Sequence, residues 1–279
     1  AGRFAYGDRI VLSAFGAGGL YLPSHAVTLA AMVLDPNGTI KSNDLGHAFK
    51  DGVMALASAD LKIKPYGLPG HQNLTLAWSN KDRMSLSQDP SNIARLLLNE
   101  RFPMLGNPGP ILVEILERFA PGLLVPAAPL NRENKTWAAV YSFEQYLWQP
   151  AGDPKRGLGM FFSLGVSDGQ ANPIKYSYSL GVVGKGIVPA RPHDDFGIGW
   201  ARTTFSDDFV PFMRKTFDLG LRHEDAIELY YNAAVTPALS ISPSLQIISS
   251  ALNRALDSNG NLKGLDTTYV AGVRVGIRF

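Results

Sequence analysis

The sequence Thr267-Thr-Tyr-Val-Ala-Gly-Val-Arg-Val-Gly-Ile-Arg-Phe279 decides the fold class, because residues of two kinds alternate along it. One set is apolar: Tyr269, Ala271, Val273, Val275, Ile277 and Phe279. The other set is mostly small or polar: Thr268, Val270, Gly272, Arg274, Gly276 and Arg278. A period of two residues is that of a β-strand, whose successive side chains point to opposite faces. The sequence therefore predicts a strand with one apolar and one polar face.

The same two-sided pattern recurs through the rest of the chain. It occurs in nine further segments: His25–Leu34, Gly52–Ile63, Gln72–Asn80, Trp137–Trp148, Arg156–Asp168, Ile174–Lys185, Asp195–Arg202, Ala226–Val235 and Leu239–Ile248. In Arg156–Asp168, for example, Leu158, Phe162 and Leu164 alternate with glycine and serine. The pattern predicts ten strands and an all-β protein.

The connections between these segments alternate in length. Residues 64–71, 149–155 and 236–238 are short connections, whereas 35–51, 81–136, 203–225 and 249–266 are long ones. The connection 169–173 is a short exception. Short turns at one end and long loops at the other are typical of an antiparallel transmembrane β-barrel. We therefore expect a barrel of about ten to twelve strands in this chain, with a partly helical long loop.

The composition agrees with a barrel and argues against several other classes. Charged residues make up 18% and hydrophobic residues 46% of the 279 residues, which suits strands with one apolar and one polar face. A net charge of +2 is too small to predict a nucleic-acid surface. The absence of Cys excludes disulfides and thiol chemistry. No apolar run approaches the roughly 20 residues of a membrane-spanning helix.

The segment Lys81–Thr136 is expected to be an insertion within a single barrel domain that spans residues 1–279. Asp89, Pro90 and Ser91 predict one helix start, and Pro110 predicts another before Ile111–Ala120. A loop of this length either folds into the lumen and narrows it, or caps the mouth or packs against a neighbouring chain. The sequence leaves these alternatives open.

Catalytic and cofactor motifs are missing from the sequence. The five histidines are isolated from one another, and no G-x-S-x-G, P-loop or zinc spacing is present. The glycine-rich segment Gly181–Gly186 is better explained as strand. We therefore predict no enzyme, no catalytic residue, no cofactor and no metal, with an outer-membrane hydrolase that uses a Ser/His pair as an unfavoured alternative.

The polar faces of the predicted strands are the candidate functional surface. In a barrel they line the lumen, where polar and aromatic side chains hydrogen-bond hydroxylated solutes. The candidate lumen-lining residues are Lys175, Lys185, Glu228, Tyr230, Asn232, Gln246, Arg274 and Arg278. A soluble sandwich would need a second sheet to cover the opposite, apolar face, whereas lipid covers it directly.

Several segments resemble the carbohydrate-selective porins of the OprB type. They include Trp137–Leu147, Gly157–Gly169, Gly184–Gly199, Glu228–Pro237 and the closing Gly272–Phe279, which ends on the terminal Phe typical of outer-membrane proteins. The resemblance implies a location in the bacterial outer membrane and passive diffusion of sugars. It also implies small-molecule sugars and outer-membrane lipid as partners, with no nucleic acid, and leaves a homo-oligomer or a larger assembly possible.

The resemblance implies a barrel of sixteen strands, so about six N-terminal strands have no counterpart in this chain. The chain is therefore expected to be either part of a longer protein or a smaller closed barrel of ten to twelve strands. Two other functions stay open: a general or anion-preferring porin, indicated by the lysines and arginines of the polar face, and a non-conducting barrel that anchors a larger assembly.

Overall fold

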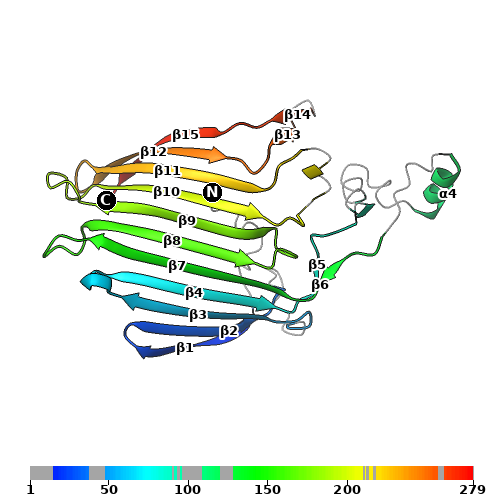
Figure 1. The fold of residues 1–279 in the computed structure, drawn as a ribbon, viewed down its shortest axis with the longest axis horizontal. Coiled ribbons are helices and arrows are strands. Elements are labelled where there is room, and N and C mark those ends of the chain that lie inside the picture. The colour runs from blue at the N-terminus through cyan, green and yellow to red at the C-terminus, as the bar shows by residue number, and fades with distance from the viewer. Residues whose placement is uncertain are drawn as a thin grey trace.

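The protein is built on one 11-stranded antiparallel sheet (Figure 1). The computed structural model describes residues 15–37, 48–89, 91–92, 95, 109–119, 128–209, 211, 214–215, 218–256 and 261–278. The strands, in their order across the sheet, are β1 (Gly16–Ser24), β2 (Val27–Leu34), β3 (Met54–Ile63), β4 (Gly70–Ser79), β7 (Thr136–Trp148), β8 (Gly157–Ser167), β9 (Ile174–Lys185), β10 (Asp195–Phe205), β11 (His223–Ala234), β12 (Leu239–Ser249) and β15 (Thr268–Ile277). Each strand pairs with its neighbours along the chain, as in an up-and-down barrel wall.

All ten predicted strands are confirmed, and β1 is an additional strand that the sequence did not predict. Its sequence, GAGGLYLPS, contains three glycines and a proline and has no alternation of polar and apolar residues. The strand forms because it pairs along β2, from Gly16 opposite Leu34 to Ser24 opposite Val27. Tertiary pairing thus decides the conformation of a segment that has no strand pattern of its own.

The two ends of the sheet differ in the length of their connections. Residues 25–26, 64–69, 149–156, 186–194 and 235–238 connect strands at one end, while residues 35–53, 80–135, 206–222 and 250–267 connect them at the other. The exception at 168–173 is tight because the Asp168 carboxylate accepts hydrogen bonds from the N–H groups of Trp137 and Gln170, at 2.9 and 3.1 Å. The predicted alternation of short and long connections is confirmed.

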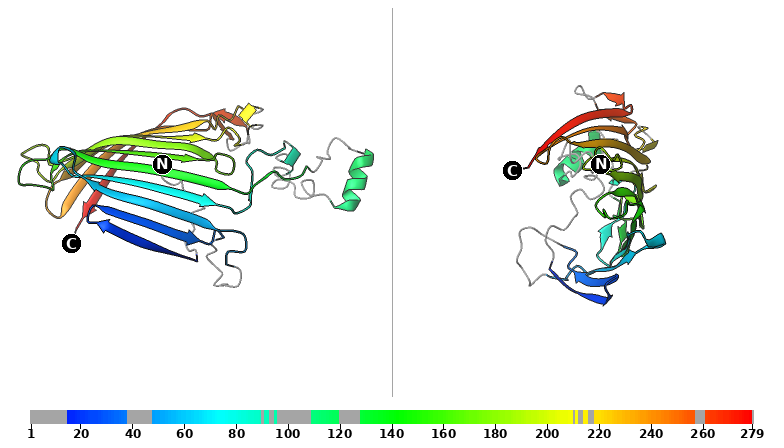
Figure 2. Two further views of the ribbon diagram at one scale, coloured as in Figure 1. Left: turned by 60° about the horizontal axis from the view of Figure 1, so that its bottom comes forward. Right: turned by 90° about the vertical axis from the view of Figure 1, so that its left-hand side faces the viewer.

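The connections carry the remaining elements. Within the described residues these are the 3₁₀ turn η2 (Pro65–Gly67), α4 (Pro110–Phe119), and the short paired strands β5 (Arg83–Met84) with β6 (Arg132–Glu133) and β13 (Arg254–Leu256) with β14 (Leu262–Gly264). The helix predicted at Pro110 is confirmed, and α4 lies beyond the ends of the strands (Figures 1 and 2). Most of the helix predicted after Ser91 lies outside the described residues. No helix within the described residues is long and apolar enough to cross a membrane.

The sheet is curved, and none of the described elements forms a second layer on either of its faces (Figure 2). Within the described residues, β1 and β15 stand at the two edges without pairing to each other, so the sheet is open. The buried hydrophobic residues of the described part are only Leu116, Ala171 and Ala251. A soluble domain of this size would bury many more. The sheet is therefore a wall with two exposed faces rather than one half of a sandwich.

One face of this wall is apolar. Cross-strand pairing puts Leu180 opposite Trp200, Trp200 opposite Ile227, and Ile198 opposite Leu229. Leu180, Ile198 and Leu229 are each about half exposed, at 47%, 50% and 49%. A continuous apolar surface of this extent is not stable in water and requires lipid or protein against it.

Near the long-loop end, the apolar face carries a polar cluster. Arg202 donates two hydrogen bonds to the Asp225 carboxylate, at 2.7 and 2.9 Å, and Trp200 Nε1 donates a third at 3.0 Å. The ring of Tyr178 lies 5.6 Å from that of Trp200. Tyrosine and tryptophan with paired charges are typical of the boundary between hydrocarbon and water.

At the short-turn end, the buried Asp194 ties the connection 186–194 to β11. Its carboxylate accepts hydrogen bonds from the Arg191 guanidinium at 2.7 Å, from the Ala234 N–H at 2.9 Å, and from the Tyr231 hydroxyl. Burial alone would raise the pKa of Asp194, but these three donors outweigh it and hold the pKa below its usual value. The carboxylate is therefore more stable as an anion in the folded protein than in the unfolded chain.

Asp194→Asn is expected to lower stability at pH 7 and to remove part of the acid sensitivity. Because the folded-state pKa is depressed, the carboxylate contributes stability above about pH 4, and this contribution is lost as pH falls through the folded-state pKa. The urea midpoint of the detergent-folded protein should therefore drop in the variant at pH 7, and the gap to the parent should narrow by pH 3. A gap that does not change with pH would contradict this role of Asp194.

Candidate functional site

The register of the strands brings polar residues from separate strands into rows on the face opposite the apolar one. Lys185 pairs with Asp195, and Asp195 pairs with Asn232. In a second row, Glu228 pairs with Gly199 on one side and with Gln246 on the other. Directly paired residues share a face of a sheet, so these side chains lie on one surface.

A hollow of about 590 Å³ lies on this polar face over β10, β11, β12 and β15. It is lined by Asp195, Glu228, Tyr230, Asn232, Ser240, Ser242, Ser244, Gly272, Val273 and Arg274. Its size falls in the range of small-molecule sites. Both signs of charge and several hydroxyl groups are present, so the hollow offers donors and acceptors to a polar solute.

A chain of hydrogen bonds holds part of this lining in place. Asn232 Nδ2 donates to Asp195 Oδ2 at 2.8 Å, and Ser242 Oγ donates to Asn232 Oδ1 at 2.7 Å. The three residues come from β10, β11 and β12, so the bonds connect three strands. Side chains fixed in this way need little reordering when a solute binds.

Of the candidate lumen-lining residues, Glu228, Tyr230, Asn232 and Arg274 line this first hollow together. Gln246 stands directly opposite Glu228 on the same face. The other three lie elsewhere. Lys185 lines a second hollow, of about 570 Å³, that shares Asp195 with the first, and Lys175 is at the far end of β9 with its Nζ 5.7 Å from the Tyr176 ring centroid. Arg278 follows β15, and its N–H donates to the Ala238 carbonyl.

The sequence prediction missed two parts of this lining. Alternation along Leu239–Ile248 puts Ser240, Ser242 and Ser244 on the polar face, but they are not among the candidate lumen-lining residues. Asp195 is the first residue of its strand, and only the register shows that it meets Asn232. The serine ladder could have been found from the sequence, because three serines at a spacing of two must share a face of a strand.

Groups that could hold a metal ion are not found within the described residues, where no three His, Asp or Glu side chains gather. Among the described histidines, His71 makes the shortest acidic contact, with its Nε2 2.6 Å from Asp60 Oδ2 across β3 and β4. The side chains that line the two hollows offer groups for hydrogen bonding and charge pairing.

Comparison with known proteins assigns the family. The model of the carbohydrate-selective porin, OprB family, matches residues 6–279. The chain belongs to this family. The OprB family match covers the sheet, the insertion and both hollows, and it confirms the resemblance seen in the sequence.

Individual relatives of the OprB family agree. Porin B of Pseudomonas aeruginosa is 33% identical over 145 residues, which are 47% of this chain and 30% of Porin B. The high-pH structure of Pseudomonas putida OprB has a TM-score of 0.64 at 22% identity and covers 95% of this chain and 58% of that one. The low-pH structure has a TM-score of 0.50 at 20% identity and covers 94% and 54%. The chain thus spans little more than half of the solved OprB chain and has its fold.

Proposed function

We propose that this chain forms the wall of an outer-membrane pore through which sugars and other small hydrophilic solutes diffuse passively. The proposal rests on the difference between the two faces of one sheet, one apolar and one polar. The half-exposed apolar side chains of one face require a lipid environment, and the other face carries the hollow lined by Glu228, Asn232 and Arg274. Membership of a porin family supports a channel rather than an enzyme.

The lining explains how a sugar would cross without energy coupling. Hydroxyl groups of the sugar exchange water for the carboxylates of Asp195 and Glu228 and for the guanidinium of Arg274. The serine hydroxyls beside them both donate and accept. Because two carboxylates stand beside one guanidinium, this part of the wall does not attract anions. This favours neutral solutes over the anion-preferring alternative.

The setting of the pore follows from the same wall. In the outer membrane, the short turns face the periplasm and the segment 81–136 belongs to the outer side of a single barrel domain. Unpaired backbone groups within lipid cost several kcal/mol each, so the edges at β1 and β15, which are unpaired within the described residues, must be paired in the membrane.

Swelling of proteoliposomes in iso-osmotic sugar tests the proposal. Vesicles that hold the purified protein should swell in glucose, more slowly in a trisaccharide, and more slowly in gluconate than in glucose. The physical reason is exclusion by width together with the acidic lining. Faster swelling in gluconate would favour the anion-preferring porin, and vesicles that do not swell despite folded protein would favour the non-conducting anchor.

A further inference from the structure

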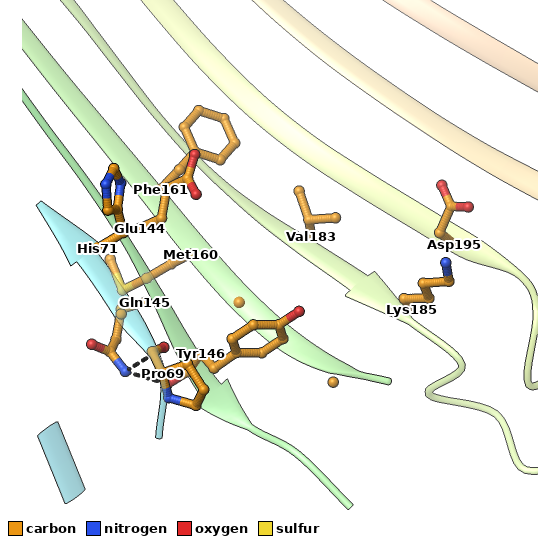
Figure 3. Close-up of a pocket in the computed structure, with 13 residues that line it drawn as sticks. Pro69, His71, Glu144, Gln145, Tyr146, Met160, Phe161, Val183, Lys185 and Asp195 are labelled. Atoms are coloured by element: carbon orange, nitrogen blue, oxygen red, sulfur yellow. Dashed lines mark hydrogen bonds between the residues drawn. The ribbon is translucent and has the colours of Figure 1, made fainter. Parts of the chain in front are cut away.

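The second hollow lies on the polar face over β4, β7, β8, β9 and β10, beside the first (Figure 3). Its lining includes Tyr146, Phe161, Val183 and Lys185, and Asp195 belongs to both hollows. Apolar and aromatic side chains are unexpected on a wall that faces water. They are expected where a ligand with an apolar surface binds.

The ring of Phe161 extends along the wall because glycines leave room for it. A Cβ at position 181 would stand 2.6 Å from Cε1 and Cζ of Phe161, and a Cβ at position 199 would stand 3.4 Å from Cζ. Gly181 and Gly199 belong to the next two strands and pair with each other. The ring therefore reaches across β9 toward β10 and presents its surface to the hollow (Figure 3).

Two tyrosines on the same face use glycines in the same way. A Cβ at position 157 would stand 2.9 Å from Cδ1 and Cε1 of Tyr146, and a Cβ at position 197 would stand 2.5 Å from Cε1 of Tyr230. Each ring thus lies over a glycine of an adjacent strand. Glycine weakens a strand, so its repeated use under these rings indicates a requirement for close approach of ring and backbone.

Polar groups stand on both sides of the Phe161 ring. Glu144, which belongs to β7, pairs with Phe161 of β8 on one side and with His71 of β4 on the other. Lys185 and Asp195 stand on the other side of the hollow (Figure 3). Glu144 and Lys185 are exposed, so both are accessible to a solute. An apolar ring surface between a carboxylate and an ammonium group matches a solute with one apolar face and a rim of hydroxyl groups.

We propose that the hollow around Phe161 is a subsite for a neutral pyranose sugar, whose C–H face lies against the Phe161 ring and whose hydroxyl groups reach Glu144, Lys185 and Asp195. The proposal rests on the proposed function, since it takes the polar face as the one that meets solutes. Aromatic rings attract polarised C–H groups in addition to burying apolar area. The two carboxylates of Glu144 and Asp195 outnumber the single ammonium group of Lys185, so the hollow disfavours acidic sugars.

With this subsite, the wall has two neighbouring sites that a sugar can occupy one after the other. Because Asp195 borders both hollows, a sugar that leaves the Phe161 ring can keep one hydroxyl contact while it moves toward Asn232 and Arg274. Both hollows lie near the short-turn end, since β7, β9 and β11 end there and β8, β10 and β12 begin there. Sites that share a contact lower the barrier between binding and release.

Saturation-transfer NMR with methyl β-glucopyranoside tests the subsite on the detergent-folded protein and needs no closed pore. Transfer is expected to be strongest to H1, H3 and H5, the protons of one ring face. Phe161→Ala should weaken sugar binding by about three- to tenfold and remove this preference, because the ring that the sugar face contacts is gone. Phe161→Tyr should keep both the affinity for the sugar and the preference for H1, H3 and H5, since it retains the ring.

Phe162→Ala is the matched control, since Phe162 is adjacent in sequence and its side chain points to the opposite, apolar face. It should bind sugar like the parent. Equal losses in Phe161→Ala and Phe162→Ala, or no loss in either, would overturn the subsite. Swelling of vesicles reports separately on the pore. If vesicles swell but Phe161→Ala binds sugar as the parent does, the pore stands and the subsite is wrong. If sugar binding depends on Phe161 but vesicles do not swell, the subsite stands and the pore is wrong.

Discussion

Leu229→Arg is expected to prevent the protein from folding into a bilayer, whereas Glu228→Arg is expected to fold. The two residues are adjacent on β11 and point to opposite faces. Leu229 pairs with Ile198 and Leu245, so an arginine there would stand in the middle of an apolar row. Arginine on the lipid face near the middle of a barrel wall costs about 2–4 kcal/mol. Such a cost is a large part of the total stability of most proteins.

The comparison between the two variants separates burial in lipid from general disruption of the strand. Both substitutions introduce the same side chain into the same strand, so any cost to the backbone is shared. Folding into vesicles can be followed by the shift in electrophoretic mobility between unheated and heated samples. If Glu228→Arg failed and Leu229→Arg folded, the assignment of the two faces would be reversed.

Alternation of apolar and polar residues was sufficient to predict most of the sheet. A strand with one apolar and one polar face has a period of two, which is visible at Leu239–Ile248 and in the final strand. The strand Gly16–Ser24 was missed because its glycines carry no face preference. The short strands β5 and β6 were missed for another reason, since they pair across the long insertion, Arg83 opposite Glu133.

The candidate site was predicted by face but not by position along the strands. Lys175 and Lys185 share a face by alternation, yet they stand at opposite ends of β9, and of the two only Lys185 lines one of the two hollows described above. Which residues meet across strands depends on the register, which single-sequence patterns do not contain. The contact between Asp195 and Asn232 is of this kind.

The alternation of apolar with small or polar residues did not predict the aromatic side chains on the polar face. Assigning small residues to the polar face of Arg156–Asp168 picks out Gly159, Ser163 and Gly165 and leaves out Phe161. The glycines beside its ring, Gly181 on the next strand and Gly199 on the strand after it, look like weak strand positions in the sequence alone. Only the structure shows that these glycines leave room for the ring of Phe161, which extends over them.

We expect the polar face to line a water-filled path, and the absence of cysteine makes this directly testable. Ser244 lines the first hollow, and Leu245 beside it is 39% exposed on the apolar face. A small, charged, water-soluble thiol reagent added to single channels should reduce the conductance of Ser244→Cys, because the attached group occupies the path.

Leu245→Cys is the matched variant and should keep its conductance, because lipid excludes a charged reagent from that face. The cysteine-free parent should not respond. We therefore predict a stepwise loss of current in Ser244→Cys alone. Block of Leu245→Cys with no effect on Ser244→Cys would contradict the assignment of the faces and, with it, the proposal that this wall surrounds a pore.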